Sequence, residues 1–250
     1  MEKNQSENVS LNPTVLHITH HKAGSQWIKS ILTDCFPEKI VEPKLYEAQF
    51  LKEPIYQGKI YPTIYISKQQ FDTVELPKLC KKFIVIRDLR DTLISMYFSY
   101  KISHVFTSDT PLMIKTREIL NSVSLDDGLI YLMEHQLPWE RLIQLSWIQS
   151  GEPVIRYEEL LKNDINILSK LLIDDFHLQI DHERLHQIII ANRFVNITGR
   201  AAGMEKIDSH NRKGVSGDWK NYFSKKVKGV FKEQYGNSLI QAGYEKDTNW

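Results

Sequence analysis

The stretch VLHITHHKAGSQW, residues 15–27, joins a run of apolar residues to the start of a helical pattern. Its first five residues are typical of a short buried strand, and a helix is expected from Ser25 to about Cys35. Between the two, Lys22 stands two positions before Gly24. Backbone N–H groups at a helix N-terminus, together with the helix dipole, favour an anion, and a glycine lets the backbone approach it closely. The stretch therefore predicts an anion site, with a plain strand-to-helix turn as the alternative.

The alternation of strand and helix continues along the chain. The patterns predict strands at 82–86 and 153–157, extended runs at 60–61 and 63–66, and helices at 91–102, 125–150 with a break near Pro138, 158–172 and 181–190. This order favours an α/β fold of three layers, with a central parallel sheet flanked by helices. Ligands of such sheets bind beyond the carboxyl ends of the strands. We expect a flexible N-terminus at 1–12 and a single domain at 13–250.

The composition is that of an ordinary globular protein. The 250 residues carry a net charge of +1, so the chain lacks the basic field of a nucleic-acid-binding protein, and no stretch is apolar enough for a membrane span. Cys35 and Cys80 are the only cysteines, which predicts a reducing cytoplasmic location without disulfides. His20 and His21 are adjacent, but no further ligands stand at a zinc-like spacing, so no metal is expected. The oligomeric state is not indicated.

A second stretch, FIVIRDLRDTLISMYFSY, repeats the pattern of strand, cation and helix. Arg87 ends the expected strand, Asp91 is the expected N-cap of the helix, and Ser95 follows Arg87 by eight residues. An arginine fork and a hydroxyl at this spacing are able to converge on one phosphate. A solvated cluster of arginines and aspartates is the alternative.

A third stretch, HNRKGVSGDWKNYF at 210–223, combines two cations with two glycines and a tryptophan. Arg212, Lys213 and Gly214 suit a clamp over a phosphate, whereas a basic surface loop tethered by Trp219 is the alternative. Three such stretches in one chain together predict a ligand that carries at least two separate anionic groups.

The three stretches, in this order, resemble the sulfotransferases that use 3′-phosphoadenosine 5′-phosphosulfate (PAPS). The first motif of that family reads roughly YPKSGTTW, and residues 20–27 read HHKAGSQW. Its second motif, an arginine followed eight residues later by a serine, is similar to Arg87 and Ser95. Its third, RKGxxGDWK, stands intact at 212–220. The resemblance implies a P-loop-NTPase-like sulfotransferase fold and a PAPS-dependent enzyme.

The resemblance also implies a role for each matching residue. Lys22 is expected to be catalytic, stabilising the phosphate from which the sulfuryl group departs. The 5′-phosphate is expected on the loop and helix start at Ala23, Gly24, Ser25 and Gln26. The 3′-phosphate is expected on Arg87, Ser95, Arg212, Lys213 and Gly214, and the adenine on Trp27, Tyr157 and Phe194. Core packing is the alternative for the three aromatic residues.

The base that takes the proton of the acceptor departs from the family pattern. Cytosolic members use a histidine in a KTHLP segment, and counting back from Arg87 without gaps places Tyr65 at that position. A tyrosine, whose pKa is near 10, is a poor base at neutral pH. The alternatives are His20 and His21 beside Lys22, His104 past the second helix, and carboxylates at Glu42, Glu47 and Glu53.

These observations predict transfer of a sulfuryl group from PAPS to the hydroxyl of a small-molecule acceptor. Residues 97–150, expected to be helical and rich in aromatic side chains, are expected to shape the acceptor pocket, with Tyr65 and His104 facing the acceptor. An apolar or lipid-like alcohol is the expected substrate class. The alternatives are a non-catalytic PAPS- or nucleotide-binding protein and a nucleotide-dependent kinase, although the Walker spacing of kinases does not occur.

Overall fold

The sheet is parallel throughout, as the sequence predicts. The computed structural model describes residues 12–44, 49–104 and 111–250, and part of the expected N-terminus therefore lies outside the described residues. The strands are β1 (Thr14–Thr19), β2 (Ile60–Tyr65), β3 (Cys80–Ile86) and β4 (Val154–Arg156). They lie in the order β2-β1-β3-β4, and every pair is parallel. β1 therefore lies between β2 and β3, and the loop that follows β1 begins in the interior of the sheet's carboxyl edge.

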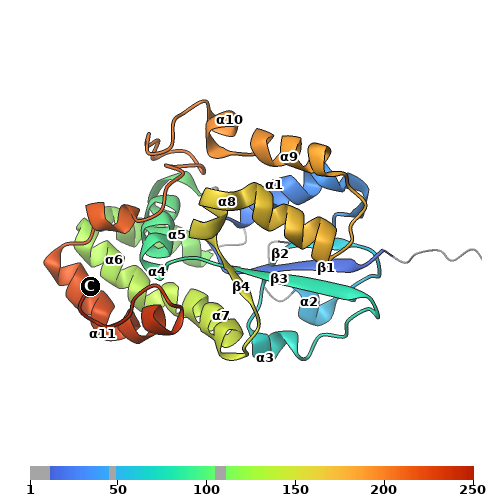
Figure 1. Cartoon of the computed structure of the whole chain (residues 1–250). Helices are drawn as coiled ribbons and strands as arrows, with labels where there is room; N and C mark the ends of the chain where they lie inside the picture. The colour runs from blue at the N-terminus through green and yellow to red at the C-terminus, as the bar shows by residue number, and fades with distance from the viewer. Residues whose placement is uncertain (1–11, 45–48, 105–110) are drawn as a thin grey trace, which may run out of the picture.

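Helices cover both faces of the sheet, which confirms the three-layer α/β fold (Figure 1). The α-helices around the sheet are α1 (Ser25–Cys35), α2 (Gln49–Lys52), α3 (Lys68–Phe71), α7 (Leu137–Gln149), α8 (Tyr157–Ser169), α9 (His182–Ala191) and α10 (Phe194–Thr198). In Figure 1, α1, α8 and α9 lie above the sheet, whereas α3 and α7 lie below it.

The alternation of side chains along β1 explains these two layers. Val15 joins the buried cluster of α1, α8 and α9, whereas Leu16 and Ile18 join the cluster that contains Trp147 of α7. Successive side chains of a strand point to opposite faces. All six residues of β1 are buried, and its polar side chains, Thr14, His17 and Thr19, each form a hydrogen bond with a backbone carbonyl.

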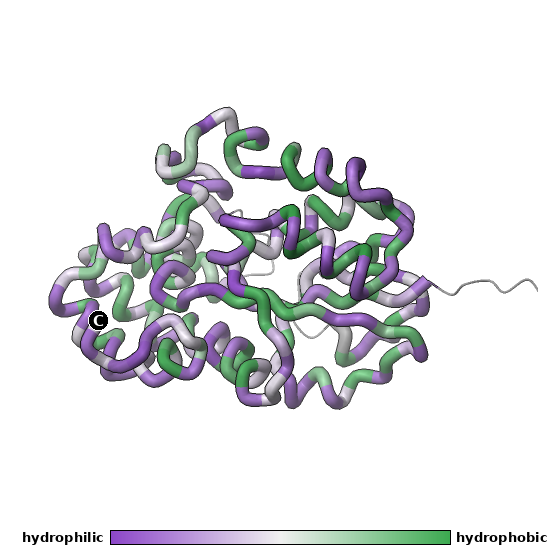
Figure 2. Tube along the Cα trace, in the orientation of Figure 1, coloured by the Kyte–Doolittle hydropathy of each residue, from purple (hydrophilic) through white to green (hydrophobic). Residues whose placement is uncertain are grey.

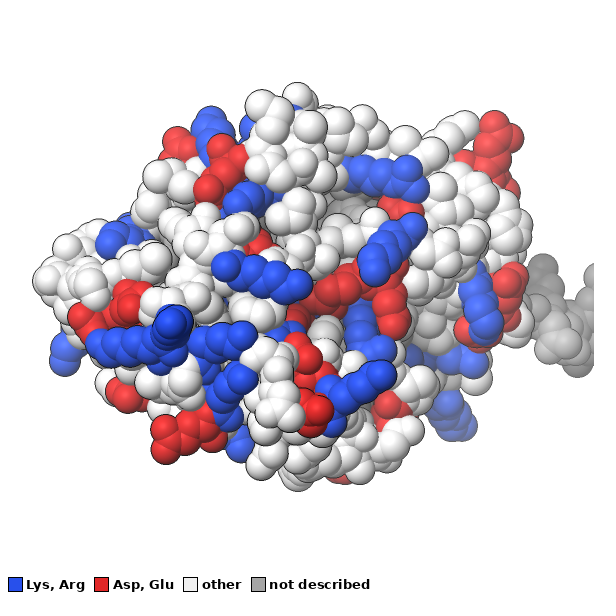
Figure 3. Space-filling model, turned by 60° about the vertical axis from the view of Figure 1, so that its left-hand side comes forward, with Lys and Arg blue, Asp and Glu red and all other residues white. Residues whose placement is uncertain are grey.

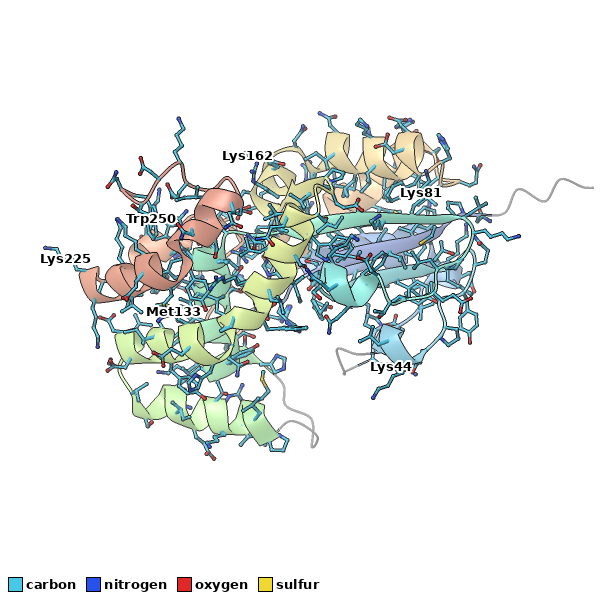
Figure 4. All side chains as sticks on the ribbon, turned by 90° about the horizontal axis from the view of Figure 1, so that it is seen from below. Lys44, Lys81, Met133, Lys162, Lys225 and Trp250 are labelled. Carbon is cyan, nitrogen blue, oxygen red and sulfur yellow. The ribbon has the colours of Figure 1, made fainter. Side chains whose placement is uncertain are left out.

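A second group of helices lies beyond the carboxyl ends of the strands. It contains α4 (Leu89–Phe98), α5 (Pro111–Ser122), α6 (Leu125–His135) and α11 (Lys225–Gln241). These helices enclose an apolar cluster of their own, which includes Leu93, Leu129 and Phe231. Figure 2 shows apolar segments along these helices, and Figure 4 shows α5, α6 and α11 at the opposite end from the sheet. The carboxyl edge of the sheet is therefore faced by helices from distant parts of the chain.

The remaining elements are short turns of helix. They are η1 (Pro37–Lys39), η2 (Ser99–Ser103), η3 (Lys170–Asp175) and η4 (Asp218–Asn221). Basic and acidic side chains are interspersed over the face that Figure 3 draws, as a net charge of +1 predicts. Within the three described ranges, no helix has both the length and the apolar character that crossing a membrane requires.

Three local expectations were wrong. The separate extended runs expected at 60–61 and 63–66 form one strand: β2 is at an edge of the sheet, where the missing N–H of Pro62 is tolerated, and the Pro62 carbonyl accepts from Nδ1 of His17. Asp91 does not cap α4, because Asp88 accepts the N–H of Arg90 at 2.9 Å and caps the helix instead. Tyr157 is the first residue of α8 rather than the end of a strand.

Candidate active site

The loop after β1 has the backbone shape of an anion cradle. Lys22 has a φ of 65° and Gly24 a φ of 85°, so two left-handed residues turn the chain between strand and helix. Gly24 is the N-cap of α1 and no side chain caps the helix, which leaves its first amides, including those of Ser25 and Gln26, directed out of the helix end. A Cβ added to Gly24 would lie 2.7 Å from Cδ2 of Tyr157. Position 24 therefore requires glycine for two reasons: its φ is positive, and a side chain there would collide with Tyr157.

Arg87 ties this loop to the other two motifs. Its Nη1 donates to the Lys22 carbonyl at 2.8 Å, and its Nη2 donates to the Val215 carbonyl at 3.4 Å. The guanidinium also lies over the ring of Tyr157, 4.6 Å from the centroid. Segments separated by more than 120 residues are thereby held around one cation.

Asp91 supplies a second tie between α4 and the third motif. It is buried, and its carboxylate accepts the N–H of Gly217 at 2.5 Å and the N–H of Trp219 at 3.0 Å. Gly217 has a φ of 78°, so the turn that presents these two amides requires a left-handed residue. Asp91 therefore fixes the loop that carries Arg212 and Lys213.

The cations of the third motif are already paired with carboxylates. Asp218, which is buried, accepts from Arg212 at 2.5 Å and from Lys213 at 2.7 Å, and Glu205 also pairs with Arg212. Burial lowers the pKa of Arg212, but the hydrogen bonds to Asp218 and Glu205 outweigh it and raise that pKa. The hydrogen bond to Asp218 likewise raises the pKa of Lys213. Both side chains are thus held in place as cations.

Lys22 is in the opposite electrostatic situation. Burial, and then the positive charges of Arg87 and Arg212, lower the pKa of Lys22 to about 8, while Glu140 opposes the shift. The repulsion shows that cations from all three motifs lie close together. An anion placed among them would raise the pKa of Lys22 again.

The aromatic residues line the same region. Trp27 contacts Tyr157 edge to face, with ring centroids 6.1 Å apart. Phe194 lies directly on Gly214, where an added Cβ would come within 2.4 Å of the ring, and the Arg200 guanidinium lies over the Phe194 ring, 5.0 Å from its centroid. Tyr157 contacts the cradle and Phe194 contacts the third motif, so neither is an ordinary core residue.

The two adjacent histidines differ sharply. His20 is fully buried; its Nδ1 donates to the His21 carbonyl at 3.0 Å and its Nε2 accepts the N–H of Arg87 at 3.1 Å. Burial lowers the pKa of His20 to about 4. Neither nitrogen is available to an acceptor, so this geometry does not support His20 as the base. Its role is to join the β1 loop to the end of β3.

His21 is partly exposed and is oriented from two sides. Its Nδ1 donates to Oε1 of Glu140 at 2.8 Å, and 27% of its side chain is exposed. Its ring stacks on Tyr65 with centroids 3.8 Å apart, and the Tyr65 hydroxyl lies 3.0 Å from Oγ of Ser25. The imidazole therefore lies beside Tyr65, which the ungapped count from Arg87 places at the expected position of the base.

Comparison with known proteins identifies the chain. The family model described as "Sulfotransferase domain" matches residues 12–243. The chain belongs to the sulfotransferase family. Sulfotransferase 1E1 of Rattus norvegicus is 25% identical, with 88% of this chain and 81% of that protein covered, and the protein of the same name from Homo sapiens is 21% identical, with 90% and 83% covered.

Solved structures support the fold of this sulfotransferase. A mouse sulfotransferase, SULT7A1, complexed with PAP has a TM-score of 0.65 and 20% identity, with 94% of this chain and 90% of that chain covered. Retinol dehydratase in a complex with retinol and PAP has a TM-score of 0.55 and 12% identity, with 92% and 82% covered. The chain is thus a sulfotransferase enzyme with the three-layer fold that the sequence predicts.

The other candidate bases of the sulfotransferase lie in different surroundings. His104 follows η2, its ring packs against Tyr100, and burial followed by the charge of Lys22 lowers its pKa. Glu42 pairs with Lys29, and Glu53 pairs with Lys44. Glu47 lies outside the described residues.

Several residues of the sulfotransferase site carry no signal that the sequence analysis detected. Glu140 lies in an amphipathic helix, 119 positions from His21, and Asp91 was interpreted as a cap. His210 was quoted with the third stretch but given no role; burial and the charge of Lys22 lower its pKa.

Proposed function

We propose that this sulfotransferase takes the sulfuryl group from PAPS and transfers it to an acceptor hydroxyl. The observation that carries the proposal is the convergence of Lys22, Arg87 and the Arg212 loop, three cationic motifs held together by the hydrogen bonds of one guanidinium. A donor with phosphates at two separate positions needs cations at two separate positions. The PAP found with mouse SULT7A1 and with retinol dehydratase supports the same donor.

The residues present fit such a nucleotide. Gly24 leaves a space that a Cβ would fill, at the end of a helix whose first amides are not capped by a side chain. Trp27 Nε1 and Arg87 Nε are buried and, within the described part of the chain, have no hydrogen-bond partner. Orphaned donors at a cationic site are what an absent anionic ligand leaves behind.

The proposed assignments follow the geometry of the motifs. Lys22, Ala23, Gly24, Ser25 and Gln26 would hold the 5′-phosphosulfate. Arg87, Ser95, Arg212, Lys213 and Gly214 would hold the 3′-phosphate. Trp27, Tyr157 and Phe194 would contact the adenine. Hydrogen bonds to a charged group contribute about 1.5–3 kcal/mol each, so a few of these donors suffice for tight binding.

PAPS, when bound, supplies an activated sulfuryl group whose leaving group is a phosphate. Lys22 would stabilise the charge that develops on the leaving oxygen, which requires its protonated form. His21 would accept the acceptor's proton as the new bond between the acceptor oxygen and sulfur forms. We propose His21 rather than His20 because His21 is partly exposed and is held beside Tyr65.

The acceptor class stays a proposal at the level of a hydroxyl compound. Of the residues expected to line its pocket, Tyr97, Tyr100 and Met133 are buried in the helical cluster, and Phe106 lies outside the described residues. The retinol bound by retinol dehydratase supports a small apolar alcohol. Cys35 and Cys80 are free thiols, which supports a reducing cytoplasmic location.

Titration calorimetry with 3′-phosphoadenosine 5′-phosphate tests the donor, with AMP and ATP as comparison ligands. We expect binding that depends on the 3′-phosphate and that weakens about 100-fold in Arg212→Ala, because two charge-assisted hydrogen bonds are lost. Lys220→Ala is the matched control, since Lys220 is an exposed cation of the same loop that stacks on Trp219 instead. Equal affinity for AMP, or an unchanged affinity in Arg212→Ala, would contradict the proposed donor site.

A further inference from the structure

A buried carboxylate lies directly under the phosphate-binding loop. Glu140 belongs to the first turn of α7 and only 3% of its side chain is exposed. Its Oε1 accepts from Nδ1 of His21 and its Oε2 accepts from the backbone N–H of the same residue, both at 2.8 Å. One carboxylate therefore holds His21 by both main chain and side chain.

Both oxygens of this carboxylate accept a hydrogen bond. Burial of an unpaired charge is costly, so buried carboxylates are found with donors and opposite charges. Glu140 lies at the positive end of the α7 dipole and receives two N–H groups from His21. The charge of Glu140 also raises the pKa values of His20 and Lys22 against the effect of burial.

The hydrogen bond at Nδ1 decides which nitrogen of His21 is basic. In a neutral imidazole one nitrogen donates and the other accepts. Since Nδ1 donates to Glu140, the lone pair is on Nε2, and the stack on Tyr65 fixes the plane of the ring. A carboxylate that orients a catalytic histidine in this way also stabilises the imidazolium that forms when a proton is taken.

The groups that face His21 come from four parts of the chain. They are Glu140 from α7, Tyr65 from β2, His104 after η2, and His20 from its own loop. Positive charge on the neighbouring histidines would disfavour the imidazolium of His21, whereas the negative charge of Glu140 favours it.

We infer that Glu140 is a positioning residue that, with His21, forms a carboxylate–histidine pair in place of the family histidine that Tyr65 replaces. The inference rests on the proposed function of His21 and adds the group that makes it a base. Helix α7, from the region expected to shape the acceptor pocket, thereby adds a carboxylate to the histidine in the loop after β1. Glu140→Gln retains the shape and one acceptor but removes the charge.

Histidine-selective ¹⁵N NMR on the full chain, with His21→Gln to assign the signal, tests the pair. In the wild type we expect His21 as the tautomer that carries its proton on Nδ1. In Glu140→Gln we expect the pKa of His21 to fall by about one unit or more, since an adjacent opposite charge favours the protonated form. Glu134→Gln, an exposed glutamate on α6, is the control and should leave the signal unchanged.

A kinetic measurement separates positioning from a structural role. PAPS consumption with phenol as the probe acceptor should fall about 100-fold in kcat in Glu140→Gln, while the affinity for 3′-phosphoadenosine 5′-phosphate changes by less than about threefold. The acid limb of the pH profile should move to lower pH, because the base loses its proton more readily. Glu140→Asp should recover part of the rate.

The outcomes distinguish the two levels of the proposal. A wild-type His21 protonated on Nε2, or an unchanged pKa in Glu140→Gln, would overturn the pair even if the nucleotide binds. If the wild type did not bind 3′-phosphoadenosine 5′-phosphate, that result would instead contradict the proposed donor. The tautomer is measured in the wild type, so the inference stays testable if Glu140→Gln does not fold.

Discussion

The two regions that present cations to the proposed nucleotide are built in opposite ways. Lys22 lies among like charges, which together with burial lower its pKa to about 8. Arg212 and Lys213 lie on Asp218, whose hydrogen bonds raise their pKa values. An anion that reaches Lys22 relieves a repulsion, whereas an anion that reaches Arg212 has to compete with carboxylates already present. The region of Lys22 should therefore make the nucleotide affinity depend on pH. The region of Arg212 should make it depend on substitutions of the carboxylates that pair with Arg212.

The largest effect is expected from closing the cradle itself. Gly24→Ala combines an unfavourable φ with a Cβ 2.7 Å from Tyr157, and we expect the affinity for 3′-phosphoadenosine 5′-phosphate to fall about 100-fold or more. Gly151→Ala is the matched control: its φ is 75°, and no described atom lies within 4 Å of the added Cβ. If calorimetry showed the same loss of affinity in Gly24→Ala and Gly151→Ala, backbone strain rather than the closed cradle would explain the loss.

A smaller effect is expected from releasing the third motif from α4. Asp91→Ala leaves the N–H groups of Gly217 and Trp219 without their acceptor, which should lower the free energy of unfolding by about 2 kcal/mol and the nucleotide affinity about tenfold. Denaturant unfolding and calorimetry measure the two quantities. Asp72→Ala, which removes an exposed ion pair with Lys68, should change neither appreciably. Full affinity in Asp91→Ala would show that the third motif does not need this tie.

The pH dependence of binding tests the region of Lys22. Because the pKa of Lys22 is about 8 in the free enzyme and a bound anion would raise it, binding takes up a proton above pH 8. The affinity for 3′-phosphoadenosine 5′-phosphate should then fall as the pH rises above 8, approaching about tenfold per pH unit. Lys22→Arg keeps its charge over this range and should abolish the dependence. A wild-type affinity that is constant between pH 7 and about 9.5 would rule out the low pKa.

The smallest effect is expected from removing a competing anion. Glu205→Gln frees Arg212 of one carboxylate, and we expect the nucleotide affinity to rise about threefold, since a partly exposed ion pair contributes little. Glu159→Gln, an exposed glutamate paired with Arg156, is the charge-matched control. An affinity that falls in Glu205→Gln would show that Glu205 orients Arg212 rather than competing for it.

The sequence analysis was accurate where a structure depends on neighbouring residues. The helix expected from Ser25 to Cys35 has those bounds, and the helix expected at 181–190 is α9, which Asp181 caps. It was wrong where distant parts of the chain matter: Asp91 lies inside α4, where its carboxylate accepts from the amides of Gly217 and Trp219, and Pro62 is tolerated because β2 is at an edge. Propensity describes a segment by itself, and tertiary contacts override it.

The sequence by itself determined the parts of the donor site that are made of local backbone, namely the cradle from Lys22 to Ser25 and the glycine-rich loop after Arg212. Turn geometry and helix starts depend on residues only a few positions apart, so their spacing is legible in the chain. The tertiary structure alone decided that Glu140 reaches His21 across 119 positions. Such a contact depends on the order of the strands and on which helix packs below them, and no local pattern encodes it.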